Sequence, residues 1–556
     1  MLEQRKAETA VEEIKRSSHQ LRGSIANDLA SGLPNVSADS EQLLKFHGIY
    51  AQDDRDVRRE RVLRGDGLDY IFMIRVVVPG GKLSPAQWIA LDRVASDLTD
   101  GTIRLTTRQA VQFHGVVKDG LRPLAESLDH ALLSSFGGCG DVVRNVVSCP
   151  SLQIDHTDER LADLSRTLSR AFRPTTSAHW EIFINGDEAV SRAEGPERPI
   201  YGDTYLPRKF KIAVAHPEDN CVDVFAQDVG LIPETHVTAG PGFNLIVGGG
   251  LGRSYANPDT FARLGDPLAF ITYDEVEEVV AAVITTYRDL GDRTERRRAR
   301  MKYVVADLGL ATFRDAVEER LGRRLKPPMA LPVHFDARDH LGWHTYPDGT
   351  HHVGVRVSAG RVRDVEGAAQ LRSALREVAT DYDVTFHITA QQDILISRIS
   401  ADDRDHIAQI LVEHGIRLSH DLGPVERNAL ACPALPTCGQ ALAESERRLP
   451  ELVSRLEDVL ASRSSARRPL QLRMTGCPNG CARPAVAEIG VVGRTKSTYD
   501  VFVGGGPRGD RLAQLYREKV PFDDIADVLD PLVARWERDA LDDEPFGDFI
   551  ARTGVA

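Results

Sequence analysis

Long apolar stretches are missing from this chain, and none approaches the roughly 20 residues that a membrane-spanning helix needs. The opening segment MLEQRKAETAVEEIKRSSHQ also has no apolar core of the kind found in secretory signals. The sequence therefore predicts a cytoplasmic protein without a membrane partner.

Cysteine is scarce as well, with seven residues in 556. A small, odd number of cysteines in a reducing compartment favours metal binding or redox chemistry over disulfides. Positive charge is also in deficit. The net charge of -13 argues against general nucleic-acid binding, but a local basic pocket could still hold a small anion. The length predicts two to four compact units, with room to bury a large cofactor.

A long-range repeat organises the chain. VRNVVSCPSL at 143–152 returns as ERNALACPAL at 426–435, so Arg144 matches Arg427 and Cys149 matches Cys432, each 283 positions apart. RLTTRQAVQFHG at 104–115 aligns with HITAQQDILISR at 387–398 at the same offset. Such a period indicates a duplicated module whose halves pack around a pseudo-twofold axis. A site on that axis can draw residues from both halves.

Each half shows the pattern strand, helix, strand, followed by a longer mixed segment. The expected elements are a strand at 70–78, a helix at 85–98 and a strand at 103–117, then 352–357, 368–378 and 384–399 in the second half. Without regular βαβ alternation, the fold class is α+β. The proline-rich segment KPPMAL at 326–331 is the expected joint.

Closely spaced cysteine pairs occur only in the second copy. Cys432 and Cys438 form C-x5-C, and Cys477 and Cys481 form C-x3-C. Four thiolates in two pairs can hold an iron–sulfur cluster or zinc. Zinc knuckles usually have shorter spacers, so the spacing favours an iron–sulfur cluster, with zinc or unligated structural cysteines as alternatives. Cys149 lacks the neighbouring cysteines of its counterpart.

These motifs, with TGCPNGC and YLPRKFK, resemble the siroheme- and [4Fe-4S]-containing sulfite and nitrite reductases from about residue 41 to 555. LLKFHGIYAQDDRD is similar to the assimilatory sulfite reductases of that family. The resemblance implies a three-domain architecture with siroheme between the halves. It also implies that Cys481 bridges siroheme and cluster, with Cys432, Cys438 and Cys477 as the other ligands. The implied divisions are an N-terminal arm at 1–60, paired ferredoxin-like halves at 61–134 and 335–420, and cofactor-binding units at 135–330 and 421–556.

The resemblance also implies a basic substrate site. Arg75, Arg144, Lys209 and Lys211 match the residues that bind substrate and deliver protons. Lysine suits proton delivery because neighbouring cations lower its pKa, whereas arginine stays charged.

Further residues are expected near the cofactors. Arg108, Gln112 and His114 alternate along the expected strand and would face siroheme, or simply form its polar side. Arg208 would point the other way, toward cofactor carboxylates. Asn479 would bond a cluster sulfur or only make the turn. The basic run at 293–302 is expected to be helical, as a solvated face or a cofactor contact.

One glycine-rich loop has the spacing of a nucleotide-binding motif. GGGPRG at 504–509 formally satisfies G-x-G-x-x-G, but Pro507 interrupts it, and helices without a returning strand are expected to follow. Electrons would then come from a partner, either an NADPH-dependent flavoprotein or ferredoxin. The position of Cys139 resembles a feature of the ferredoxin-dependent members of the family. In some of them a cysteine at this position lies near a tyrosine, and Tyr50 would be that tyrosine here.

The implied reaction is the six-electron reduction of sulfite to hydrogen sulfide. Nitrite reduction to ammonia is the alternative, but similar nitrite reductases carry asparagine where Lys211 stands. A rival from another class is a zinc-stabilised binding protein without catalysis.

Overall fold

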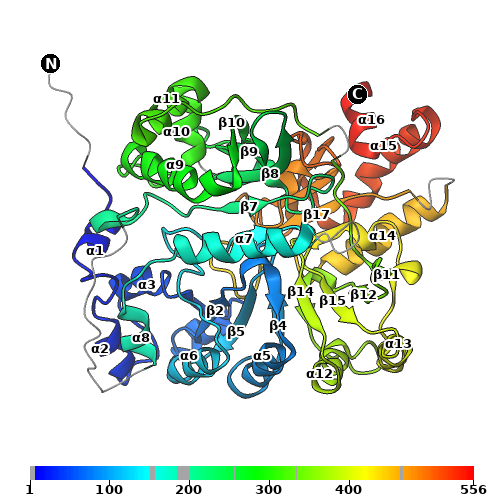
Figure 1. Ribbon diagram of the computed structural model, residues 1–556. Coiled ribbons are helices and arrows are strands. Elements are labelled where there is room, and N and C mark those ends of the chain that lie inside the picture. The colour runs from blue at the N-terminus through cyan, green and yellow to red at the C-terminus, as the bar shows by residue number, and fades with distance from the viewer. Residues whose placement is uncertain are drawn as a thin grey trace.

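The computed structural model describes residues 7–150, 157–184, 199–255, 257–332, 335–463 and 468–555 (Figure 1). Within these residues the strands form four five-stranded sheets. In Figure 1 one pair of sheets lies below the long helix α7 (Thr157–Ala171) and the other pair lies mainly above it. The mixture of helices and antiparallel and parallel strands confirms the α+β prediction.

The first pair of sheets exchanges strands between the halves. One sheet has the order β1 (Ile49–Asp53), β2 (Tyr70–Val76), β5 (Val111–Val116), β4 (Ile103–Leu105) and β13 (Arg361–Val362). The other has the order β11 (Gly342–Thr345), β12 (His351–Val355), β15 (Ile394–Ile399), β14 (Thr385–Ile388) and β3 (Lys82–Leu83). Since β3 and β13 each pair with the opposite half, the two sheets form one unit.

A reciprocal pair of glutamines locks this exchange. Gln109 adopts φ 51° and its side-chain amide donates to the Ile388 carbonyl at 2.9 Å. Its counterpart Gln392 adopts φ 69° and reaches the Leu105 carbonyl at 3.4 Å. Gly81 has φ 74°, and an added Cβ would lie 2.3 Å from the Ile388 oxygen, so only glycine fits this crossing. The sequence repeat is thus a structural pseudo-twofold.

The second pair of sheets repeats one topology. The first-half sheet has the order β10 (Asp266–Thr272), β9 (Gly240–Val247), β8 (Val229–His236), β7 (Ile212–Val214) and β6 (Val147–Ser148). The second-half sheet has the order β16 (Ala429–Ala431), β17 (Leu472–Thr475), β18 (Ile489–Gly493), β19 (Thr498–Val503) and β20 (Gln514–Pro521). In each sheet the first three strands in the chain are parallel and the remaining pairs are antiparallel.

Two expected long strands are each divided by a turn. The segment expected at 103–117 forms β4 and β5, because Thr106 accepts a hydrogen bond from the Ala110 amide at 3.2 Å and closes a turn. The segment expected at 384–399 divides in the same way, with Thr389 accepting from the Asp393 amide at 3.0 Å. Side-chain hydrogen bonds of this kind compete with the sheet ladder.

The expected helices lie on the outer faces of the first pair of sheets. α5 (Pro85–Leu98) begins at the capping box of Ser84 and Gln87, and α12 (Leu371–Asp381) packs against it. Trp88 of α5 stacks on Phe386 of β14, with ring centroids 5.1 Å apart. This contact buries apolar surface across the halves, so the two repeats share one core.

The remaining helices cover the sheets and the N-terminal segment. The helices, with their bounds, are α1 (Ala10–Arg16), α2 (Ile25–Ala30), α3 (Ala38–Leu44), α4 (Arg58–Arg64), α6 (Leu121–His130), α8 (Ala178–Phe183), α9 (Val276–Leu290), α10 (Met301–Leu308), α11 (Leu310–Leu321), α13 (Arg404–Glu413), α14 (Leu449–Ala461), α15 (Ile525–Asp539) and α16 (Phe546–Thr553). Leu21 and Ile25 are fully buried, so the described part of the N-terminal arm packs onto the body. Among the described helices, none has the length and apolar character to cross a membrane.

A buried carboxylate joins the second pair of sheets across the halves. Asp223, in the loop between β7 and β8, lies 2.6 Å from Arg473 Nη1 of β17 and also pairs with Arg483. All three side chains are buried. Removing one partner of such a cluster leaves uncompensated buried charge.

We therefore expect Asp223→Asn to lower the free energy of unfolding by about 3–5 kcal/mol. The measurement is the thermal unfolding midpoint of the cofactor-loaded protein, which should fall by several degrees. Asp315→Asn, which removes the exposed partner of Arg324, is the control and should leave the midpoint unchanged. Equal midpoints for both variants would show that the buried cluster contributes nothing to stability.

Candidate functional site

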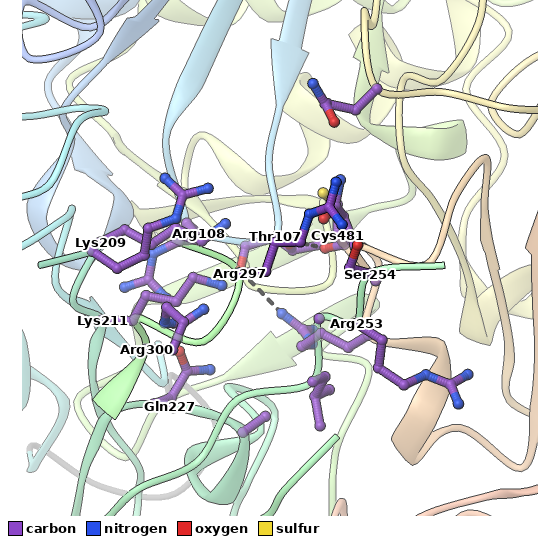
Figure 2. Close-up of a pocket in the computed structure, with 18 of the residues that line it drawn as sticks. Thr107, Arg108, Lys209, Lys211, Gln227, Arg253, Ser254, Arg297, Arg300 and Cys481 are labelled. Atoms are coloured by element: carbon purple, nitrogen blue, oxygen red, sulfur yellow. Dashed lines mark hydrogen bonds between the residues drawn. The ribbon is translucent and has the colours of Figure 1, made fainter. Parts of the chain in front are cut away.

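A cavity of about 430 Å³ lies between the two halves (Figure 2). Its lining comes from several first-half loops and from residues 440 and 479–483 of the second half. Among its described lining residues nine are cationic and none is acidic, the cations being Arg108, Arg208, Lys209, Lys211, Arg253, Arg296, Arg297, Arg300 and Arg483. In a chain of net charge -13, this concentration of positive charge fits an anionic ligand.

Two lysines enter the cavity just before β7. Lys209 and Lys211 flank Phe210, which forms an isolated bridge with Val143, so both side chains leave the backbone toward the same space. Figure 2 shows them beside Arg300, opposite Cys481. Burial, reinforced by Arg208 and other cations, lowers the pKa of Lys209 to about 7.

Lys211 is perturbed in the same direction. Burial, and then the charge of Lys209, lowers the pKa of Lys211 well below its usual range. An amine with a lowered pKa releases its proton near neutral pH. The pair can therefore both attract an anion and give up protons to it.

Two carboxylates behind the cavity hold its cations in place. Asp228 accepts from Arg300 Nη2 at 2.8 Å and from the Lys211 backbone amide at 2.9 Å. Asp141 accepts from Arg296 Nη1 at 2.9 Å and lies 3.4 Å from Arg208 Nη1. Because these carboxylates are fewer than the cations, positive charge remains for a ligand.

Arg75 differs from its counterpart in the repeat. Arg356 forms a buried ion pair with Asp393, whose oxygen lies 2.9 Å from Arg356 Nη1. No carboxylate pairs with Arg75 in the described parts of the chain. Its Nη1 instead contacts Cys139 Sγ at 3.0 Å, and Gln112, with its amide turned to accept, lies 2.6 Å from Nη2.

Arg144 differs from its counterpart in the same way. Arg427 pairs with Asp339 at 2.6 Å. Arg144 donates only to backbone carbonyls in the described structure, to Gly140 at 2.9 Å and to Gly138 at 3.2 Å. The duplication therefore neutralises the second-half arginines, whereas no described carboxylate neutralises Arg75 or Arg144. Neither first-half arginine is among the residues that line the cavity.

The four second-half cysteines gather at one edge of their sheet. Cys432 follows β16 and Cys477 follows β17, and because these strands are parallel their ends meet at one edge. Cys432 accepts from the Gly476 amide at 3.3 Å. Cys481 is exposed and lines the cavity, whereas Cys432 and Cys477 are buried and Cys438 is half-buried.

The cysteines also influence one another electrostatically. Burial, followed by the electrostatic influence of Cys481, raises the pKa of Cys432 and of Cys477 to about 12. The same causes raise the pKa of Cys438. Thiols that stay protonated without a partner need a cationic centre to become thiolates, which is how iron and zinc bind cysteine.

The predicted cofactor-binding residues separate into two groups. The cavity is lined by Arg108, Arg208, Asn479 and Cys481. Gln112 contacts Arg75 and His114 is buried in β5, and neither lines the cavity. The ring nitrogens of His114 have no hydrogen-bond partner among the described residues, and burial holds its pKa well below the usual range.

Two expected orientations differ in the structure. Arg108 lies in the turn before β5, so it does not alternate with Gln112 and His114 along one strand. Its guanidinium donates to Gln227 Oε1 at 2.8 Å. Arg208 lines the same cavity as the lysines and does not point away from them, because Asp141 draws it to that side.

The basic run contributes more than its pattern predicted. A helix over 293–302 was expected, but α10 begins only at Met301. The preceding backbone turns, so Arg296, Arg297 and Arg300 all reach the cavity. The ion pairs of Arg296 with Asp141 and of Arg300 with Asp228 hold the backbone in this conformation, so the segment does not form a helix with a solvated face. Arg253, Gln227, Gln440 and Arg483 also line the cavity without any motif that marks them in the sequence.

The glycine-rich loop at 504–509 does not begin a dinucleotide-binding unit. The expectation that no strand returns after 504–509 was wrong, because β20 pairs with β19. The pairing is antiparallel, whereas a βαβ nucleotide-binding unit needs a parallel strand. The loop packs on the first half, where Asn220 Nδ2 donates to the Arg508 carbonyl at 2.7 Å.

Tyr50 and Cys139 lie close enough to interact. Burial, and then the electrostatic influence of the neighbouring Cys139, raises the pKa of Tyr50. A covalent thioether between them stays a prediction. If it forms, the denatured protein should be two hydrogen atoms lighter by intact mass spectrometry than its sequence requires, and Cys139→Ser should remove the deficit. A full-mass wild-type protein would exclude the link.

Comparisons with known proteins agree with this site. The family model "Nitrite and sulphite reductase 4Fe-4S domain" matches residues 163–325 and 423–556. The model "Nitrite/Sulfite reductase ferredoxin-like half domain" matches 65–131 and 344–414. The chain belongs to the nitrite and sulphite reductase family, and the predicted family resemblance is confirmed. The predicted domain bounds stay predictions.

Full-length relatives share this likeness. Proteins named "Sulfite reductase [NADPH] hemoprotein beta-component" are 43% identical in Methylobacterium nodulans, covering 98% of this chain and 90% of theirs. The protein of the same name in Myxococcus xanthus is 43% identical, covering 100% of this chain and 98% of its own. The solved structure "Structure of Mycobacterium tuberculosis NirA protein" is 27% identical, with a TM-score of 0.79 over 100% of this chain and 98% of that one.

The residues present fit the family's two cofactors. Siroheme carries many carboxylates, and the buried Nε atoms of Arg108 and Arg300 have no hydrogen-bond partner in the described structure. The four clustered cysteines fit a [4Fe-4S] cluster. The prediction of siroheme and a [4Fe-4S] cluster is confirmed at the level of the family.

Proposed function

We propose that this chain is a sulfite reductase hemoprotein that reduces sulfite to hydrogen sulfide with six electrons. The observation that carries the proposal is the cavity of nine cations that meets Cys481, the exposed member of the cysteine group. When bound, siroheme and the [4Fe-4S] cluster would pass electrons from a donor protein to the substrate. The protein supplies charge, position and protons.

The proposed ligands follow from the positions of the sulfurs. Cys432, Cys438, Cys477 and Cys481 would hold the cluster, and Cys481 would also contact the siroheme iron because it alone is exposed in the cavity. Arg108 and Arg208 would contact siroheme, and Asn479 would hydrogen-bond a cluster sulfur. His114 and Gln112 do not line the cavity and would act indirectly. Gln112 would act through its contact with Arg75.

The proposed substrate group is cationic at every position. Lys209 and Lys211 would bind sulfite oxygens and deliver the protons with which oxygen leaves as water. Arg75 and Arg144, which no described carboxylate neutralises, would hold the anion, and Arg144 would help to keep the pKa of Lys209 low. Arginine suits the holding role because it does not deprotonate.

The proposed electron donor is an NADPH-dependent flavoprotein. The names of the relatives in Methylobacterium nodulans and Myxococcus xanthus support it. Ferredoxin is the alternative, favoured by the position of Cys139 beside Arg75. We place the activity in the cytoplasm, where the free cysteines of the described chain would stay reduced.

The test uses protein purified from cells that make siroheme. Visible absorption of siroheme, about four cluster irons per chain and sulfite-dependent oxidation of reduced methyl viologen are expected. Sulfide should be the product. Reduced ferredoxin and an NADPH flavoprotein are then compared as donors. Colourless protein without iron would overturn the proposal, and coloured protein that turns over nitrite but not sulfite would replace it with nitrite reduction.

Substrate preference is tested by Lys211→Asn. The second lysine adds positive charge suited to sulfite, which is larger and more charged than nitrite. The variant should therefore lose sulfite turnover by about 100-fold and nitrite turnover by clearly less. Steady-state rates with reduced methyl viologen check this, and equal losses for both anions would contradict the role of Lys211.

A further inference from the structure

A second group of metal-binding side chains lies in the first half, away from the cavity lining. Cys149, Asp219, Cys221 and His340 are each at most 2% exposed, and one ligand atom from each lies within 4.8 Å of all the others. Cys149 has no neighbouring cysteine in the sequence, so its partners became visible only in the fold.

The distances within this group match a single ion. Cys221 Sγ lies 3.1 Å from Cys149 Sγ, His340 Nε2 lies 4.0 Å from Cys149 Sγ, and Asp219 Oδ2 lies 3.0 Å from His340 Nε2. Ligands about 2.0–2.3 Å from a tetrahedral zinc are separated by about 3.3–3.8 Å. The group is therefore compact enough for one ion.

The aspartate is aimed into the group. Its Oδ1 accepts from the backbone amides of Cys221 at 2.9 Å and Arg338 at 3.2 Å. Its buried Oδ2 faces His340 Nε2 at 3.0 Å, so both groups converge on the space beside the two sulfurs. A metal ion bound there would replace the proton that otherwise lies between the carboxylate and the imidazole.

The histidine is held in place by an unusual backbone. His340 has φ 59°, a left-handed conformation that is uncommon outside glycine. Such conformations persist where the surrounding structure requires a particular side-chain position. Apolar side chains including Val222, Phe335 and Ala390 surround the group and keep water away.

The position of the group in the repeat supports a metal. Cys149 corresponds to Cys432 in the repeat. Cys221 corresponds to Cys481, because both residues precede a turn and a short 3-10 helix, which lead into β8 after Cys221 and into β18 after Cys481. The first half thus keeps two of the four cysteine positions. Pro217 stands where the second half has Cys477, so a cysteine-ligated cluster is not possible here.

We propose that Cys149, Asp219, Cys221 and His340 bind one structural zinc ion. Two thiolates, an imidazole and a carboxylate form a closed tetrahedral set, which is typical of structural zinc. A disulfide between Cys149 and Cys221 would leave the converging aspartate and histidine unexplained. His340 follows the joint between the halves, so the ion would fasten the second half to the first.

The test measures zinc and iron in the same purified, chelator-washed holoprotein. About one zinc per chain is expected beside the cluster iron. Zinc K-edge absorption should show two sulfur scatterers at about 2.3 Å and two nitrogen or oxygen scatterers at about 2.0–2.1 Å. This readout does not use sulfite turnover, so it can fail while the proposed function stands.

Two variants and a control locate the ion. Cys221→Ser and His340→Gln should lower zinc at least five-fold, while siroheme absorption and cluster iron report whether each variant folds. His344→Gln, outside the group, should retain zinc. Wild-type protein with less than one-tenth of a zinc per chain would overturn the proposal, as would a Cys149–Cys221 disulfide in mass spectra of alkylated protein. If neither variant folds, the scattering shell of the wild-type protein decides.

Discussion

Replacing Cys432 by serine is expected to remove the [4Fe-4S] cluster and reduce sulfite turnover to the background of the assay. Cys432 is buried at the end of β16, beside Gly476 and near the other cysteines proposed to hold the cluster. A serine hydroxyl is a harder and weaker ligand for iron than a thiolate. Without the cluster, electrons from the donor have no store beside the siroheme.

The measurements are cluster iron per chain, visible absorption and turnover with reduced methyl viologen. Cys149→Ser is the matched comparison, because Cys149 occupies the corresponding position of the first half and is also buried, and its replacement should affect only the proposed zinc ion. It should retain cluster iron. A Cys432→Ser protein that keeps its full iron content would show that this cysteine is not a ligand.

Replacing Lys209 by methionine is expected to lower sulfite turnover by about 100-fold or more, within the range for loss of a positioned proton donor. Methionine keeps the length and apolar packing of the side chain and removes only its charge. Lys496→Met, which removes an exposed lysine, is the control and should leave the rate unchanged.

Sulfite turnover is expected to fall as the pH rises through the pKa of Lys209. Because burial and neighbouring cations lower the Lys209 pKa to about 7, the donating form is present below that pH and is lost as pH rises through it. Cofactor carboxylates would shift this limb upward, since negative charge favours the protonated amine. Wild-type turnover should fall on the alkaline side, and the variant should lose that limb. An unchanged profile in Lys209→Met would assign the limb to another group.

Local patterns predicted many individual elements. The helix at 85–98 is α5 to the residue, because Ser84 and Gln87 form a capping box that depends only on neighbours in the chain. The strand at 103–117 was only partly right, since a hydrogen bond to Thr106 inserts a turn. The helix expected at 293–302 failed because Asp141 and Asp228, distant in the sequence, hold the arginines in another course.

The amino-acid sequence by itself determined the duplication, the α+β class, the family and the cysteines proposed to hold the cluster. These follow from residue type and from the spacing of residues along the chain, both of which can be read without a structure. Only the tertiary structure decided which cations are free to act. Arg75 and Arg356 look alike in the repeat, yet Asp393 neutralises only Arg356. Burial and pairing are properties of neighbours in space, so the chain order could not disclose them, nor the partners that Cys149 finds in Cys221 and His340.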